Sequence, residues 1–117
     1  MLSNMKQYTT PEQTAKLIEL GFEKPKSSVE CELPKGDWRI GQVGICKAYS
    51  IGELLSFLPK SIKVNDCYFT LTISAEFDNW LVEYVDIAYG SQAYVRDVEL
   101  IDALFTEIVM LKEEGVI

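Results

Sequence analysis

A strict alternation of apolar and polar residues between positions 67 and 75 most constrains how this chain can fold. The apolar positions are Cys67, Phe69, Leu71, Ile73 and Ala75, and the polar ones are Tyr68, Thr70, Thr72 and Ser74. Successive side chains of a β-strand point to opposite faces of a sheet, so this period of two predicts a strand with one buried face. Such a strand needs partner strands and a layer that covers its apolar face.

Partner strands are expected on both sides of this segment. A turn at Asp78 and Asn79 leads into residues 80–88, which predicts an antiparallel hairpin. Residues 62–64 and 93–96 are candidates for two further short strands. The sheet should therefore be antiparallel, with three or four strands between residues 62 and 95.

The second face of the predicted sheet poses a problem. If the hairpin loop has an even length, Leu81, Val85 and Ile87 lie opposite the apolar face of residues 67–75. Either the loop is odd and the register flips, or something covers these three side chains. The cover could be a helix, a second subunit, or the loop of residues 23–47 with Trp38 as its anchor.

Two short helices are expected in the first half of the chain. The first helix is expected at residues 11–20, where a capping box T-x-x-Q begins at Thr10. The second is expected at residues 50–58, where a capping box S-x-x-E begins at Ser50. Between them, prolines, glycines and charges predict a long surface loop, with a short extended piece from Trp38 to Ile45.

The longest predicted helix covers residues 98–114, with Asp97 as its N-cap. At about 100° per residue, one side collects apolar residues and the other acidic ones. The apolar stripe contains Ile101, Leu104, Phe105, Ile108 and Leu111; the acidic side contains Glu99, Asp102, Glu107, Glu113 and Glu114. We expect the stripe to cover the sheet, which predicts a two-layer α+β fold with the two shorter helices completing the core of a single domain, residues 1–117.

Composition excludes several chemistries. The chain has no histidine, which removes imidazole-activated nucleophiles and histidine-ligated zinc. Eleven acidic and two basic residues lie from position 64 onward, and a pI near 4.5 disfavours direct binding to nucleic acid. Phosphate-loop and G-x-S-x-G motifs are missing from the sequence. We expect no enzymatic activity and no cofactor.

The three cysteines and the acidic turns suggest no metal site. Cys31, Cys46 and Cys67 are an odd set without a C-x-x-C pair, so we expect reduced thiols in structural positions. Glu76, Asp78 and Asp86 carry the carboxylate oxygens that a hard cation prefers, but no EF-hand pattern surrounds them, and turn formation is the favoured interpretation. Without an apolar leader or membrane-spanning stretch, a cytoplasmic protein is expected, with no membrane partner.

Several segments resemble, in order, a group of short uncharacterised proteins from anaerobic gut bacteria and their prophages or other mobile elements. The segments are TTPEQTAKLIELGF, AYSIGELLSFLPKSI, CYFTLTIS, WLVEYVD and VELIDALFTEIVMLKEEG. The resemblance excludes residues 23–47 and implies a shared fold and an origin in a mobile element. It implies no catalytic residue, because the shared segments are packing segments.

Two hypotheses for function follow. The first is a non-enzymatic accessory protein that binds a protein partner, or a second copy of itself, through Leu81, Val85 and Ile87 and nearby aromatic residues. The alternative is a DNA-mimic inhibitor of a nuclease or DNA-binding protein, in which Glu99, Asp102 and Glu107 imitate a row of phosphates. The competing interpretation of these carboxylates is the solvated side of an amphipathic helix.

Overall fold

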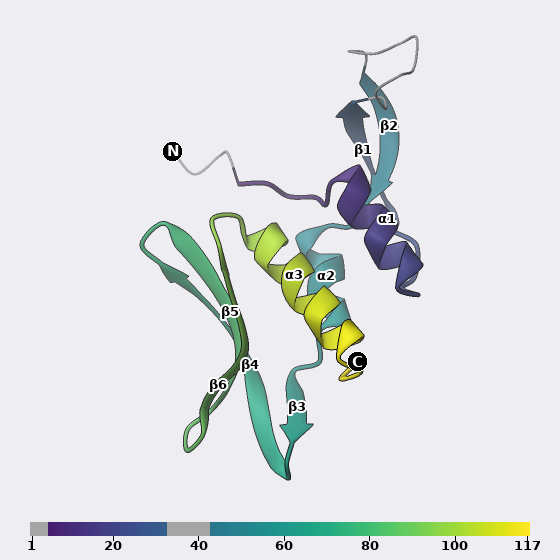
Figure 1. The fold of residues 1–117 in the computed structure, drawn as a ribbon. Coiled ribbons are helices and arrows are strands. Elements are labelled where there is room, and N and C mark those ends of the chain that lie inside the picture. The colour runs from purple at the N-terminus through teal and green to yellow at the C-terminus, as the bar shows by residue number, and fades with distance from the viewer. Residues whose placement is uncertain (1–4, 33–42) are drawn as a thin grey trace.

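The computed structural model describes residues 5–32 and 43–117 of the chain, and within them it contains three helices and six strands. In chain order these are α1 (Pro11–Glu19), β1 (Ser27–Glu32), β2 (Val43–Ala48), α2 (Ile51–Phe57), β3 (Ser61–Val64), β4 (Cys67–Glu76), β5 (Asn79–Asp86), β6 (Gly90–Asp97) and α3 (Leu100–Glu113). The predicted α+β class is confirmed, and α3 packs on the larger sheet (Figure 1).

The larger sheet has four antiparallel strands in the order β3-β4-β5-β6. Ile73 lies opposite Val82 and Leu71 lies opposite Tyr84, so the β4–β5 loop is even and the register does not flip. These four side chains belong to the face that α3 covers, which we call the helix face. Helices α1 and α2 lie on the same side of the sheet as α3 (Figure 1).

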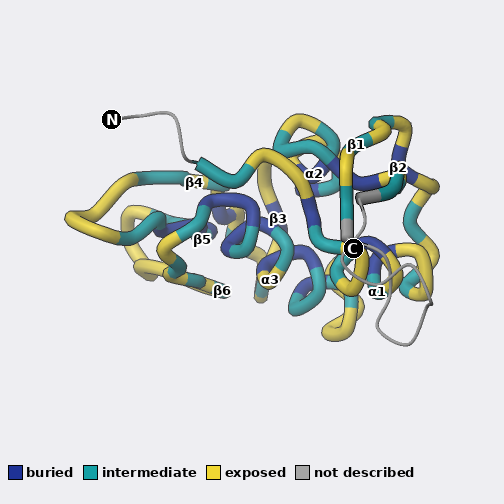
Figure 2. Tube along the Cα trace, turned by 90° about the horizontal axis from the view of Figure 1, so that it is seen from above, coloured by how far each residue is buried: buried dark blue, intermediate teal, exposed yellow. Residues whose placement is uncertain are grey.

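One apolar cluster joins the helices to this sheet. Figure 2 shows the buried stretches gathered along α2, α3 and β5, whereas the outer ends of the strands are exposed. The buried members of the cluster are Leu17, Tyr49, Leu54, Leu58, Ile62, Phe69, Val82, Tyr84, Leu100, Ile101, Ala103, Leu104, Ile108 and Leu111. Helix α3 supplies more of these residues than any other element, so it is the centre of the core.

Both predicted capping boxes are present. The Thr10 hydroxyl accepts the Gln13 N–H at 3.1 Å, and the Gln13 side chain accepts the Thr10 N–H at 2.9 Å. Ser50 and Glu53 make the equivalent pair, with both distances 3.1 Å. Helix α1 then ends before Gly21, whose φ of 97° is left-handed and therefore favours glycine.

The predicted loop of residues 23–47 is wrong, because β1 and β2 form an antiparallel hairpin there. Ser27–Glu32 reads SSVECE, with too few apolar residues to signal a strand. The expected extended piece from Trp38 to Ile45 overlaps β2 at residues 43–45, and the remainder of it, with Trp38 and Ile40, lies outside the described residues. The described part of the hairpin contributes no member to the apolar cluster, and it projects beyond α1 (Figure 1).

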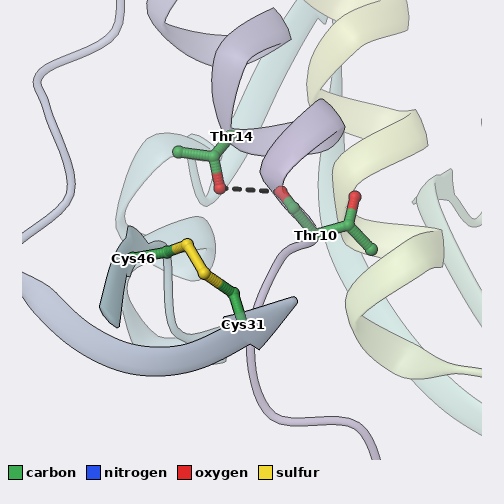
Figure 3. Close-up of a disulfide and its surroundings, with 4 residues drawn as sticks. All are labelled: Thr10, Thr14, Cys31 and Cys46. Atoms are coloured by element: carbon green, nitrogen blue, oxygen red, sulfur yellow. Dashed lines mark hydrogen bonds between the residues drawn. A yellow bond between two sulfur atoms is a disulfide. The ribbon is translucent and has the colours of Figure 1, made fainter. Parts of the chain in front are cut away.

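The expectation that all three cysteines are reduced is also wrong. Cys31 on β1 and Cys46 on β2 form a disulfide (Figure 3), and their Cα atoms lie 5.9 Å apart, within the range that such a bridge requires. The hairpin brings the two residues together, which their separation of 15 residues did not reveal. Cys67 is a free thiol at the margin of the core.

Helix α3 begins two residues later than predicted. Its N-cap is Glu99 rather than Asp97, and the Asp97 carboxylate instead accepts the Glu99 N–H at 3.1 Å. The predicted apolar stripe does face the core, through Ile101, Leu104, Ile108 and Leu111, but the buried arc is shifted around the helix. Sheet and α2 together bury an arc that begins at Ala103 and Glu107, beyond one edge of the predicted stripe, whereas Phe105 at the other edge is only partly buried.

Candidate functional site

The side of the four-stranded sheet that faces away from α3 is the candidate interaction surface, and we call it the open face. In the part of the chain that the structure describes, the helices all lie on the other side (Figure 1). The alternation of β4 and β5 and the position of β6 place on the open face Tyr68, Thr70, Thr72, Leu81, Glu83, Val85, Tyr94 and Arg96.

Leu81 and Val85 lie opposite the apolar face as predicted, whereas Ile87 lies beyond the end of β5, and the three differ in burial. Leu81 is only 6% exposed, although it lies outside the main apolar cluster. It is paired with Arg96 on β6, whose Nε donates to Glu76 Oε1 at 3.0 Å. Because Glu76 is on β4, this ion pair spans β5 on the side where Leu81 points. Val85 is half-buried, and Ile87, in the turn after β5, is fully exposed.

Two exposed tyrosines lie on the same face as Val85. Tyr68 is 63% exposed and Tyr94 is 58% exposed. Lys63 lies 5.7 Å from the ring centre of Tyr68, and Arg96 lies 5.3 Å from that of Tyr94. Such cation–ring contacts hold the ring orientation while leaving much of each ring accessible. The two tyrosines thus offer apolar area with a polar tip, as is common in protein interfaces.

A β-bulge in β6 explains how Tyr94 reaches the open face. The pairing shifts between Val82 and Tyr84, so that Ala93 and Tyr94 both lie across from Glu83. Ala93 has a φ of 50° and packs against the core. The extra residue re-aims the strand, and Tyr94 is left to point outward beside Arg96.

The sheet carries an excess of negative charge. Between residues 61 and 97 there are six acidic side chains and two basic ones, Lys63 and Arg96. Both basic groups already have carboxylate partners, because Lys63 lies 3.7 Å from Asp66 and Arg96 bonds Glu76. Glu83 lies between the apolar residues of β5 on the open face. The exposed apolar residues of the sheet are therefore surrounded by a surface with net negative charge.

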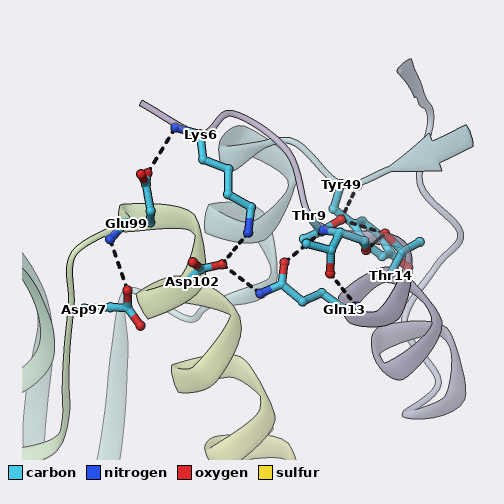
Figure 4. A network of polar contacts seen from close by, with 9 residues as sticks. Lys6, Thr9, Gln13, Thr14, Tyr49, Asp97, Glu99 and Asp102 are labelled. Atoms are coloured by element: carbon cyan, nitrogen blue, oxygen red, sulfur yellow. Dashed lines mark hydrogen bonds and ion pairs between the residues drawn. The ribbon is translucent and has the colours of Figure 1, made fainter. Parts of the chain in front are cut away.

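Two of the three carboxylates predicted to form an acidic row make contacts within the molecule (Figure 4). Glu99 Oε2 accepts the Lys6 backbone N–H at 3.0 Å. Asp102 Oδ1 accepts from Lys6 Nζ and from the Gln13 side-chain amide, both at 2.8 Å. Partial burial raises the pKa of Asp102, but these two hydrogen bonds outweigh it and hold that pKa below its ordinary value.

The prediction that Glu107 faces solvent is wrong. Glu107 is fully buried, and neither carboxylate oxygen has a hydrogen-bond partner in the described structure. Burial, together with the negative charges of Glu114 and Glu83, raises the pKa of Glu107 to about 8, so the group is largely protonated at neutral pH. The same burial, with Glu107 nearby, raises the pKa of Tyr84 to about 12, and the Tyr84 hydroxyl donates to the Pro59 carbonyl at 2.7 Å.

A signal for this burial was present in the sequence. Leu100, Ala103, Leu104, Ile108 and Leu111 repeat at helical spacing, and Glu107 occupies a position inside that repeat. The acidic row that a DNA mimic requires is therefore not formed by Glu99, Asp102 and Glu107. Sequence reasoning also missed Lys6 and Gln13, because nothing local reveals partners that lie about 90 residues away along the chain.

The acidic residues considered as cation ligands are separated by the fold. Glu76 and Asp78 lie at the β4–β5 turn, and Asp86 lies at the opposite end of β5. Asp86 Oδ1 accepts the N–H groups of Ala88 and Tyr89 at 2.7 and 3.0 Å, which is the predicted role in a turn. Across residues 5–32 and 43–117, no group of three acidic or cysteine side chains is placed to hold one metal ion.

None of the helices in the described residues is long and apolar enough to cross a membrane. Comparison of the chain with protein-family models, with curated proteins and with solved structures finds no match.

Proposed function

We propose that this chain is a non-enzymatic interaction protein that binds a basic protein surface through the open face of its four-stranded sheet. The observation that carries the proposal is the presence of Tyr68, Val85 and Tyr94 on the open face, with Ile87 exposed in the turn that directly follows β5. The setting in a phage or other mobile element rests on the sequence resemblance alone and is a separate part of the proposal.

The apolar residues supply the anchors of the proposed interface. Tyr68 on β4 and Ile87 at the end of β5 lie near the same end of the sheet, because Thr70 pairs with Val85. A few residues near the centre of an interface, with tyrosine prominent among them, usually account for most of its binding energy. Thr70 and Thr72 beside them can exchange hydrogen bonds with a partner without adding charge.

The charge of the sheet selects the class of partner. Six acidic side chains against two paired basic ones favour a surface that carries lysine or arginine. The same excess, in a chain with a net charge of −7, works against pairing of two copies face to face. A basic protein with an apolar centre therefore fits the open face better than a second copy does.

The proposal is tested with displayed peptides that combine lysine or arginine with an apolar anchor, selected on the immobilised protein. We expect the selected peptides to lose at least about tenfold in affinity for an Ile87→Ser, Tyr68→Ser double variant, the loss typical of truncated hot-spot residues. The matched control is Ile45→Ser on β2, which removes a side chain that is 74% exposed but lies outside the open face.

Two outcomes contradict the proposal. One is a selection whose peptides bind the double variant and the Ile45→Ser variant equally well. The other is a dimer, seen by sedimentation at micromolar concentration, that the double variant abolishes, because that result assigns the open face to self-association.

A further inference from the structure

The Cys31–Cys46 disulfide occupies an unusual place in the molecule. Neither cysteine belongs to the apolar cluster, and both side chains are partly exposed. Both line a surface hollow of about 890 Å³ between the hairpin and residues 6–12, and we call it the disulfide hollow. Figure 3 shows the bridge beside the start of α1, away from the sheet.

The walls of the disulfide hollow are fixed without help from the bridge. Residues 6–12 are held to α3 by the contacts of Lys6 with Glu99 and Asp102. The Thr9 N–H donates to the Tyr49 carbonyl, and the Tyr49 N–H donates to the Thr9 hydroxyl, each at 3.0 Å. At the same end of the hairpin, where β1 begins, the Glu53 carboxylate accepts from the Lys26 N–H and the Ser27 hydroxyl, both at 3.2 Å.

We propose that the Cys31–Cys46 disulfide is a thiol–disulfide exchange site, which a dithiol reductant reduces in the folded protein by entering the disulfide hollow. A thiolate of the dithiol attacks one sulfur, the Cys31–Cys46 bond breaks, and the other cysteine leaves as a thiolate. The second thiol of the reductant then attacks the mixed disulfide. The dithiol is oxidised to a disulfide and supplies both electrons, and Cys31 and Cys46 are released as thiols.

The position of the bridge supports this assignment. A disulfide buried in a core is reached only after unfolding, whereas one that lines an open hollow is accessible to a thiolate in the native state. Reduction leaves the sheet and α3 with all their apolar contacts, because the hairpin contributes none to the cluster. Loss of the bridge removes its constraint on the unfolded chain, so we expect the melting temperature to fall by about 10 to 20 °C while the protein stays folded at room temperature.

The test compares the rate of reduction by dithiothreitol in buffer and in concentrated urea, with thiols trapped by alkylation and assigned by mass spectrometry. We expect the native rate to lie within about tenfold of the unfolded rate, with circular dichroism of the reduced protein unchanged at room temperature. A parallel arm with reduced glutathione separates a monothiol source from a dithiol one, because glutathione leaves a mixed disulfide until a second molecule resolves it.

A pair of variants tests the route of attack. Val29 lines the disulfide hollow and pairs with Cys46, whereas Ile45 points to the opposite face of the same hairpin. We expect Val29→Trp to slow native reduction by about tenfold and Ile45→Trp to leave it unchanged, with equal rates for both variants in urea. A native rate that is about a hundredfold or more below the unfolded rate, or that follows global unfolding as urea is added, overturns the proposal.

Discussion

At the scale of single residues, Glu107 makes the stability of the protein depend on pH. Its carboxyl is fully buried and has no hydrogen-bond partner, and its pKa is raised to about 8. Between the ordinary pKa of 4.5 and that value, the folded protein holds a proton that the unfolded chain has released. Stability at this site therefore falls as pH rises through that window and does not change further above it.

Replacing Glu107 by glutamine should remove this pH dependence. We expect Glu107→Gln to be more stable than the parent by roughly 2 to 4 kcal/mol at about pH 9 and to differ little from it near pH 4. Urea unfolding followed by circular dichroism across this range measures the difference. Glu19→Gln, a change at an exposed position of α1, is the control and should show no such trend. A difference that is the same at every pH would show that Glu107 does not titrate on unfolding.

At the scale of elements, helix ends were predicted well where the signal was local. Capping boxes join residues three apart, so Thr10 with Gln13 and Ser50 with Glu53 could be predicted from spacing alone. The structure shows a second role for Glu53, whose carboxylate also accepts hydrogen bonds from Lys26 and Ser27 at the start of β1. Partial burial raises the pKa of Glu53, but the hydrogen bonds from Ser50, Lys26 and Ser27 together outweigh it and hold that pKa below its ordinary value.

A substitution at the cap of α2 measures the contribution of this local signal. Ser50→Ala removes the acceptor for the Glu53 N–H, and we expect it to lower the free energy of unfolding by about 1 kcal/mol. Ser56→Ala on the same helix removes an exposed hydroxyl that donates to the Glu53 carbonyl, and it should cost less than about 0.5 kcal/mol. Equal losses for the two variants in a urea titration would indicate that the cap contributes nothing particular to α2.

At the scale of the whole molecule, the structure combines a core with a projecting part. The radius of gyration is 16.1 Å, whereas a compact domain of this length has about 13 Å. The core is built around α3, which contacts the four-stranded sheet on one side and α2 on another. The β1–β2 hairpin stands apart from it and is joined to it through α1 and Glu53, whereas the disulfide links only the two strands of the hairpin.

The core should unfold as a unit. Leu104 lies in α3 and is completely buried, and we expect Leu104→Ala to lower the free energy of unfolding by about 2 to 5 kcal/mol. In a Trp38→Phe background, the fluorescence of Trp80 on β5 reports on the sheet, and far-ultraviolet circular dichroism reports on the helices. We expect both signals to give the same urea midpoint, whereas separate midpoints would show that the sheet and the helices unfold independently. The control Ile45→Ala should cost less than about 0.5 kcal/mol.

The sequence by itself determined the elements whose signals repeat over a few residues. The alternation from Cys67 to Ala75 predicted β4, and the turn at Asp78 and Asn79 predicted its hairpin with β5, whereas only the structure decided that the loop is even. The periodicity of residues 100–111 predicted α3 and its packing on the sheet. Strand and helix periods are properties of neighbouring residues, so they can be recognised without knowledge of the remaining chain.

Tertiary structure alone decided which contacts form between distant segments. The pairing of β1 with β2 placed Cys31 beside Cys46, which lies 15 residues further along the chain. Lys6 forms an ion pair with Asp102, which lies 96 residues further along the chain. A side chain's burial and partners depend on where other elements come to lie in space, and no local pattern of residues records that position.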